Sequence, residues 1–254
     1  MTPPGGRFKD HFSSIAAAYA AHRPSYPPAL IERLTRVAPV RRLAWDAGCG
    51  SGQLSVLLAG RFERVWATDA SQEQIARATA HPKVAYRCAP AESSGLPDAV
   101  VDLATAAQAA HWFDLPSYYA EVRRVVRPGG ILALISYGVM SVDADLDAII
   151  QPFYHDVLGS YWPPERRHVD EGYRSLSFPF EEPADPAPPL EIRLQWRLED
   201  LVGYVGTWSA VWALRRAEGQ ARLEVFHEAL ARAWGPSERI RTVRWPLAIR
   251  VGRV

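Results

Sequence analysis

Residues 44–53 read AWDAGCGSGQ, and this stretch decides the fold. A short apolar run leads to Asp46, a turn with glycines at positions 48, 50 and 52 follows, and an apolar helical pattern begins at Leu54. A glycine has no Cβ, so it suits a backbone that turns sharply or lies against a ligand. The order of strand, glycine turn and helix therefore predicts a ligand-binding turn at the end of a first strand.

A second carboxylate follows at the spacing that such a site requires. The next apolar run, residues 65–68, ends at Asp69, which lies 23 residues after Asp46. A carboxylate that holds ribose hydroxyls is expected about 20 residues after a glycine turn of this kind. Together the two features predict a cofactor that contains adenosine.

The glycine spacing bears on which cofactor binds. A dinucleotide site would read G-x-G-x-x-G, but the place of the last glycine holds Gln53 counted from Gly48, and Ser55 counted from Gly50. A pyrophosphate favours bare backbone N–H groups at a helix N-terminus, whereas the carboxylate of Asp46 suits a ligand with a cationic part. S-adenosylmethionine carries an ammonium and a sulfonium and has no phosphate.

At this point the chain resembles the class I S-adenosylmethionine-dependent methyltransferases of the small-molecule type. Further segments are similar to that family in order and spacing over about residues 40–137: WATDAS at 66–71, APAE at 89–92, DLAT at 102–105 with QAAHWFD at 108–114, and RPGG at 127–130. One glycine motif alone would be weak evidence, but four ordered segments are strong. The resemblance implies a transfer of the cofactor's methyl group to a small-molecule acceptor.

Residues at the matching positions are expected to form the site. The cofactor-binding candidates are Asp46, Gly48, Cys49, Gly50, Gly52, Gln53, Asp69, Ala70, Ala91, Glu92 and Gln108, with Tyr19 and Arg23 from an N-terminal arm that closes over the cofactor. The substrate-facing candidates are Trp112, Tyr26 and Tyr137. An aromatic face such as that of Trp112 would attract a sulfonium by about 0.5–2 kcal/mol.

His111 is the candidate catalytic residue, because it falls in the loop after the fourth strand. Two roles stay open for it. As a general base it would be neutral when active, and activity would rise with pH near its unperturbed pKa of about 6.5. As a positioning residue it would only hold the acceptor. No carboxylate partner for His111 is legible in the sequence, which favours positioning.

Apolar runs alternate with helical patterns and predict an α/β fold. Strands are expected near 42–47, 64–69, 84–88, 101–106, 130–136, 191–198 and 242–251, and helices near 29–37, 52–59, 71–79, 116–125, 143–158, 201–215 and 221–234. The fold class is a Rossmann-like, seven-stranded, mostly parallel sheet with helices on both faces.

The same pattern divides the chain into four parts of one domain. Residues 1–40 are expected to form an N-terminal helical arm, and residues 41–140 are expected to form the cofactor-binding core. Residues 141–189 contain a proline-rich stretch and are expected to form a cap insertion that shapes the acceptor pocket. Residues 190–254 supply the last two strands and the helices between them.

Composition restricts the partners and the compartment. The net charge is +1, from 29 basic and 28 acidic residues, so nucleic acid is not an expected partner. No apolar run is long enough to span a membrane, the two cysteines form no disulfide framework, and the seven histidines give no metal-ligand spacing. We expect a cytoplasmic monomer or homodimer without a metal.

Two alternatives to a methyltransferase stay open. One is an NAD(P)-dependent oxidoreductase, against which the glycine spacing and Asp46 argue. The other is a catalytically silent regulatory protein that keeps the cofactor pocket. The acceptor and the atom methylated are not predictable from fold-level analogy.

Overall fold

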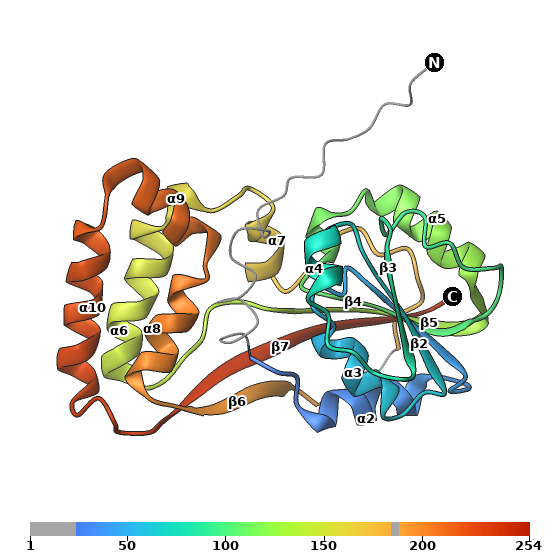
Figure 1. Cartoon of the computed structure of the whole chain (residues 1–254), viewed down its shortest axis with the longest axis horizontal. Coiled ribbons are helices and arrows are strands. Elements are labelled where there is room, and N and C mark those ends of the chain that lie inside the picture. Colours follow the sequence, from blue (N-terminus) through green and yellow to red (C-terminus); the bar gives the residue numbers. More distant parts are fainter. Residues whose placement is uncertain (1–23, 184–187) are drawn as a thin grey trace, which may run out of the picture.

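The computed structural model describes residues 24–183 and 188–254. Its centre is one seven-stranded sheet with the order β3-β2-β1-β4-β5-β7-β6 (Figure 1). The first five strands are parallel, β7 is antiparallel to β5, and β6 is antiparallel to β7. The strands are β1 (Leu43–Ala47), β2 (Arg64–Asp69), β3 (Val84–Cys88), β4 (Val101–Ala107), β5 (Val126–Tyr137), β6 (Leu190–Trp196) and β7 (Arg241–Arg253). The predicted Rossmann-like sheet is thereby confirmed.

Helices cover both faces of the parallel half. Helices α2 (Pro28–Val37) and α3 (Gln53–Ala59) bury Leu30, Leu34 and Leu58 in one core. Helices α5 (Leu115–Val125) and α7 (Arg166–Asp170) pack on the opposite core, while α4 (Gln72–Ala76) lies against β2 and β3. A parallel strand that is covered on both faces reads as a continuous apolar run, which is why the sequence pattern identified these strands.

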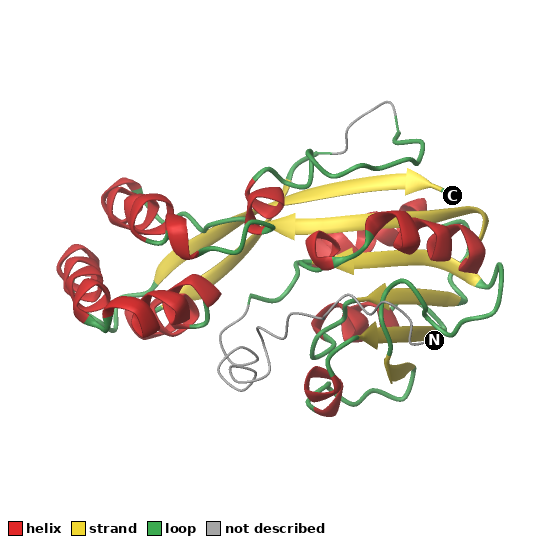
Figure 2. Cartoon of the chain, turned by 90° about the horizontal axis from the view of Figure 1, so that it is seen from above, coloured by secondary structure: helices red, strands yellow, loops and turns green. Residues whose placement is uncertain are grey.

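A separate group of helices lies beyond the carboxyl ends of the parallel strands (Figures 1 and 2). It contains α6 (Ala144–Pro152), α8 (Leu198–Gly206), α9 (Ser209–Glu218) and α10 (Ala221–Trp234). Helix α6 packs on α10, and the rings of Phe153 and Phe226 stack with centroids 3.7 Å apart. The helical layer is therefore built from two stretches, one inside the expected 141–189 cap and one between β6 and β7. Periodicity marks an apolar helix face but does not say which partner covers it.

Two predicted helices are broken in the structure. The α-helix expected over 143–158 ends at Pro152 and continues as the π-helical segment η3 (Phe153–Val157). Proline lacks the N–H that the α-helical ladder needs, so a change of hydrogen bonding at this place follows from its chemistry. The helix expected over 201–215 is divided between α8 and α9, and Trp208 between them is 4% exposed.

Candidate functional site

A cavity of about 890 Å³ opens at the carboxyl ends of β1, β2 and β4. This edge is where open α/β sheets bind ligands. The predicted residues that line it are Asp46, Gly48, Cys49, Gly50, Gln53, Asp69, Ala70, Ala91, Glu92, Gln108, His111, Trp112, Tyr26 and Tyr137. Gly52 was also predicted, but it packs against Tyr86 and does not line the cavity. Tyr19 and Arg23 lie outside the described residues.

The glycine turn is packed so closely that side chains do not fit at two positions. Gly48 has φ +67°, and a Cβ there would overlap Ala109 Cβ and lie 3.0 Å from Phe113 Cζ. Gly52 has φ +86°, and a Cβ there would overlap the hydroxyl of Tyr86. Both positive φ values disfavour L side chains as well. Gly52 therefore supports the turn from the β3 side rather than the cavity.

Asp69 fastens the turn to the end of β2. Its Oδ2 accepts a hydrogen bond from Gly50 N at 2.9 Å, and its Oδ1 accepts one from Ser71 N at 2.9 Å. Burial raises the pKa of Asp69, and these two N–H groups oppose the rise. A carboxylate oxygen can accept more than one hydrogen bond, so Asp69 can hold ligand hydroxyls at the cavity while it shapes the turn.

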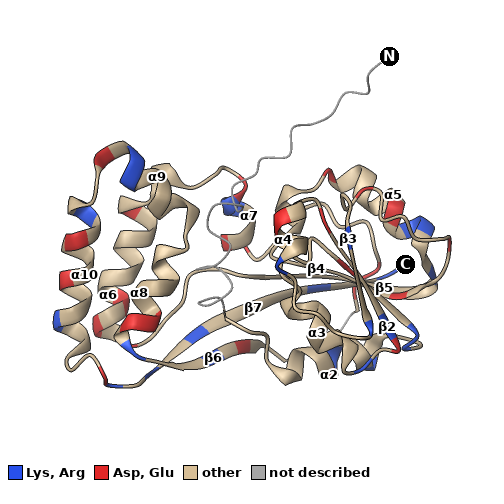
Figure 3. Cartoon of the chain, in the orientation of Figure 1, with Lys and Arg blue, Asp and Glu red and all other residues tan. Residues whose placement is uncertain are grey.

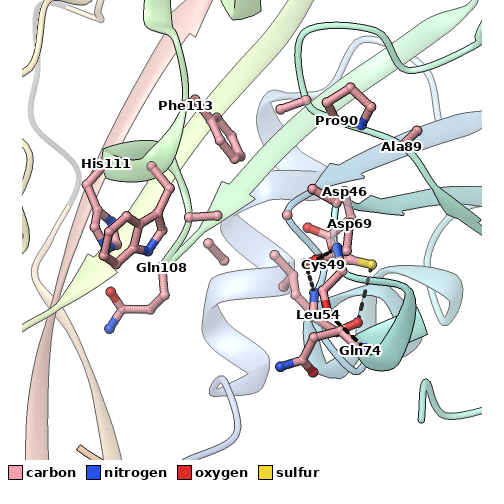
Figure 4. Close-up of a pocket in the computed structure, with 18 of the residues that line it drawn as sticks. Asp46, Cys49, Leu54, Asp69, Gln74, Ala89, Pro90, Gln108, His111 and Phe113 are labelled. Carbon is pink, nitrogen blue, oxygen red and sulfur yellow. Dashed lines mark hydrogen bonds between the residues drawn. The ribbon is translucent and has the colours of Figure 1, made fainter. Parts of the chain in front are cut away.

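Asp46 is a buried carboxyl group, only 1% exposed. Its two oxygens accept hydrogen bonds from Ser55 Oγ at 2.6 Å and Thr105 Oγ1 at 2.9 Å (Figure 4 shows its place at the turn). Burial raises the pKa of Asp46 to about 6, and the two hydroxyl donors oppose that rise. A cation bound in the cavity would favour the ionised form.

The raised pKa predicts a pH-dependent loss of stability that Asp46→Asn removes. The carboxyl group titrates near 3.8 when unfolded and near 6 when folded. The contribution of Asp46 to the free energy of unfolding is therefore full below pH 3.8. It is lost as the pH rises through 6, and the total loss is about 3 kcal/mol. Denaturant unfolding of both proteins at pH 4 and pH 7.5 measures this. From pH 4 to pH 7.5, the free energy of unfolding of Asp46→Asn should rise by about 2–3 kcal/mol relative to that of the wild type. If the difference between the two proteins is the same at both pH values, the pKa of Asp46 is not raised.

The side chain of Gln108 is held in one orientation by its amide nitrogen. Its Nε2 donates to the carbonyl oxygen of Tyr137 at 2.7 Å, which fixes the orientation of the amide, because only the nitrogen can donate. Its Oε1 is buried and has no hydrogen-bond partner in the described part of the chain. The backbone of Gln108 has φ +56°, an uncommon conformation for this residue type. A buried polar atom of this kind calls for a ligand or a water.

His111 lies across the cavity from the glycine turn (Figure 4). Its Nδ1 is 2.9 Å from the hydroxyl oxygen of Tyr173, and its ring lies against Trp112 with centroids 4.8 Å apart. Burial, together with the positive charges of the nearby Arg166 and His168, lowers the pKa of His111 to about 3. The unperturbed value of 6.5 therefore does not describe this imidazole, and no rise of activity near pH 6.5 is expected from it.

Several residues of the site were not among the candidates from sequence. Ser71 and Phe113 lie inside the segments that resemble the family, Gln74 and Ser117 follow those segments, and Glu165 comes from the start of α7. The first four follow from the rule that the carboxyl ends of parallel strands meet at one edge. Glu165 and Tyr173 belong to a segment that follows His111 by about 60 residues in the chain. Only the tertiary structure brings this segment to the site.

The lining of the cavity is acidic. Five acidic residues line it (Asp46, Asp69, Glu92, Asp114 and Glu165), and no Lys or Arg does within residues 24–183 and 188–254. Over the same residues, no three His, Cys, Asp or Glu side chains gather as a metal site would require. Such a lining favours a ligand with cationic groups over a pyrophosphate.

Known proteins are similar to this chain in sequence and in fold. A sequence model of the methyltransferase domain family matches residues 45–134. A Dictyostelium discoideum protein named as a methyltransferase is 36% identical over 236 residues, which cover 91% of this chain and 89% of that protein. A Mycobacterium tuberculosis protein, also named as a methyltransferase, is 40% identical over 125 residues, or 49% of this chain and 51% of that one.

A solved structure is similar over nearly the whole chain. It is described as a type II methyltransferase from Anaeromyxobacter dehalogenans, with 53% identity and a TM-score of 0.85. The alignment covers 91% of this chain and 97% of that one. The glycine turn, the carboxylate after β2 and the acidic cavity thus lie in a fold that this protein shares with its relatives. The chain belongs to the class I S-adenosylmethionine-dependent methyltransferases.

Proposed function

We propose that the protein transfers a methyl group from S-adenosylmethionine to a small-molecule acceptor. The observation that carries the cofactor assignment is the buried Oε1 of Gln108, which has no hydrogen-bond partner among residues 24–183 and 188–254 and belongs to a residue of a cavity lined by acidic side chains. That oxygen can accept a hydrogen bond from the ammonium of the cofactor, and the carboxylate of Asp46 stabilises a cation nearby. NAD would bring a pyrophosphate into the same acidic lining.

The remaining parts of the cofactor have candidate partners along the cavity. We assign the ribose hydroxyls to Asp69, and the adenine to the segment around Ala91 and Glu92, both of which line the cavity. The backbone at Gly48 and Gly50 lies between these two ends. Bound there, the cofactor supplies a methyl group that its positive sulfur already activates. The chain's own task is to align the reacting atoms and exclude water.

The acceptor is assigned to the end of the cavity that faces the helical layer. Tyr26, Trp112 and Tyr137 supply aromatic surface there, and His111 and Glu165 supply polar groups. The rings of Tyr26 and Tyr137 meet edge to face, with centroids 6.3 Å apart. A pocket of mostly aromatic lining with few polar groups suits a small organic molecule.

Transfer of labelled methyl groups tests the proposal. The protein is incubated with methyl-labelled S-adenosylmethionine and a panel of organic acids, phenols, amines and hydroxylated metabolites. Label should appear in at least one acceptor, and transfer should fall at least tenfold in Asp69→Ala. Cofactor binding without transfer to any member of a broad panel would favour the catalytically silent reading. Transfer only to a macromolecule would contradict the small-molecule acceptor.

We also propose a class of partner, an oligomeric state and a compartment for the protein. Basic and acidic residues are interspersed along the ribbon in Figure 3, and the net charge is +1, which supports a partner other than nucleic acid. Cys49 and Cys88 are both unpaired, which suits the reducing cytoplasm, and we propose a monomer or homodimer there. No helix in residues 24–183 and 188–254 is long and apolar enough to cross a membrane.

A further inference from the structure

Tyr173 is a buried residue that the sequence did not connect with the site. It follows α7, and its side chain is 1% exposed. Its backbone has φ +61°, an uncommon conformation for a residue other than glycine. Its hydroxyl oxygen lies 2.9 Å from Nδ1 of His111, a residue 62 positions earlier in the chain. The ring centroids of Tyr173 and His111 lie 5.9 Å apart, and the ring of Trp112 lies on His111 with centroids 4.8 Å apart.

The hydroxyl proton of Tyr173 has one evident destination. Burial raises the pKa of Tyr173 well above its usual range, which keeps the phenol protonated, while Arg166 and the backbone N–H groups of His111 and Ala110 oppose the rise. Among the residues that the structure describes, Nδ1 of His111 is the one acceptor within hydrogen-bond distance of the Tyr173 hydroxyl, so the phenol donates its hydrogen bond there. An Nδ1 that accepts a hydrogen bond carries no proton.

The charged groups around His111 also keep the ring neutral. Arg166 faces it from α7, and its guanidinium contacts the Tyr154 hydroxyl at 2.6 Å and Asp170 at 3.3 Å. His168, on the same helix, adds to the effect of Arg166. A neutral imidazole with an unprotonated Nδ1 has its single proton on Nε2. No hydrogen-bond partner of Nε2 is present in the described residues, and His111 lines the cavity.

We propose that Tyr173 locks His111 as the Nε2–H tautomer and that His111 donates this hydrogen bond to an unprotonated oxygen of the methyl acceptor. The oxygen is that of a carboxylate or a phenolate, whose negative charge the methyl group neutralises. This inference rests on the proposed function. His111 then removes no proton: an electron pair of the acceptor forms the bond to the methyl carbon, the sulfur–carbon bond breaks, and the sulfur keeps its electrons. Tyr173 is a positioning residue in this arrangement.

Nitrogen NMR of the imidazole tests the tautomer without turnover. The chain is labelled with ¹⁵N-histidine, saturated with S-adenosylhomocysteine, and its two-bond ¹H–¹⁵N correlations are recorded from pH 5 to 8. The signals of His111 are identified by their loss in His111→Gln. We expect the Nε2–H pattern throughout this range. An Nδ1–H pattern, or a titration between pH 5 and 8, would overturn the proposal.

Tyr173→Phe provides the matched variant, because it removes only the hydroxyl. It should replace the single pattern of His111 by a mixture of tautomers, with the circular dichroism spectrum unchanged. The control is Ser175→Ala, which removes the hydroxyl 2.8 Å from Nδ1 of the more exposed His168. That change should leave the His111 signals as they are. An unchanged His111 pattern in Tyr173→Phe would show that this hydroxyl does not set the tautomer.

The donor role is tested with an acceptor found in the labelled-methyl assay. In glutamine the amide N–H can take the place of the imidazole Nε2–H, so His111→Gln should keep kcat and KM within about threefold. His111→Leu should raise KM at least tenfold. Loss of nearly all turnover in His111→Gln, with normal acceptor binding, would show a base and overturn the donor role. If no acceptor is methylated, the NMR result still decides the tautomer.

Discussion

Gly48→Ala is expected to destabilise the protein by about 2–5 kcal/mol and to abolish measurable cofactor binding. The new Cβ would overlap Ala109 Cβ and meet Phe113, and overpacking of this kind costs about 1–3 kcal/mol. The positive φ adds about 1–2 kcal/mol for a residue with a Cβ. Denaturant unfolding measures the stability, and calorimetry with S-adenosylhomocysteine measures the binding.

Two variants separate the clash from the backbone strain. Gly95 has φ +72° with nothing near the place of a Cβ, so Gly95→Ala should cost only about 1–2 kcal/mol and leave binding intact. Gly48→Ala combined with Ala109→Gly removes the overlapping methyl group and should recover much of the lost stability. Equal losses in Gly48→Ala and Gly95→Ala would show that the close approach of the turn to Ala109 has no energetic weight.

Asp69→Ala is expected to weaken S-adenosylhomocysteine binding by about 1.5–3 kcal/mol, or roughly tenfold to hundredfold. The change removes the proposed acceptor of the ribose hydroxyls. It also frees the N–H groups of Gly50 and Ser71, which Asp69 now holds at 2.9 Å. Hydrogen bonds to a charged acceptor are about twice as strong as neutral ones, so Asp69→Asn should lose only part of this affinity.

The control for Asp69 is a carboxylate of the same type outside the cavity. Asp98 is 77% exposed and pairs with Arg124 at 2.6 Å on the surface. Asp98→Ala should leave cofactor affinity unchanged. If Asp69→Ala kept the wild-type dissociation constant with its fold intact by circular dichroism, the ribose assignment would be wrong.

The parts of the site that could be predicted from sequence are those that local chemistry determines. The turn at Gly48, the strand ends at Asp46 and Asp69 and the loop at Gln108 each follow a buried strand, and parallel strands bring such ends to one edge of the sheet. These residues line one cavity in the structure.

The contribution of distant segments could not be predicted in the same way. Tyr173 meets His111 through the packing of α7 on the sheet, a contact that no local pattern encodes. The neutral state of His111 depends on burial and on Arg166, which are tertiary properties. The helical layer likewise joins α6 with α8 and α10, because their apolar faces cover one another, and a single sequence does not pair such faces.

Titration calorimetry distinguishes S-adenosylmethionine from NAD as the cofactor of this protein. The full chain is titrated at pH 7.5 with S-adenosylmethionine, S-adenosylhomocysteine and NAD, with Asp69→Ala as a parallel sample. We expect both adenosyl compounds to bind at one site per chain, with weaker binding in the variant, and NAD to give no saturable heat. Saturable binding of NAD together with no binding of either adenosyl compound would show that the cavity is not a site for S-adenosylmethionine.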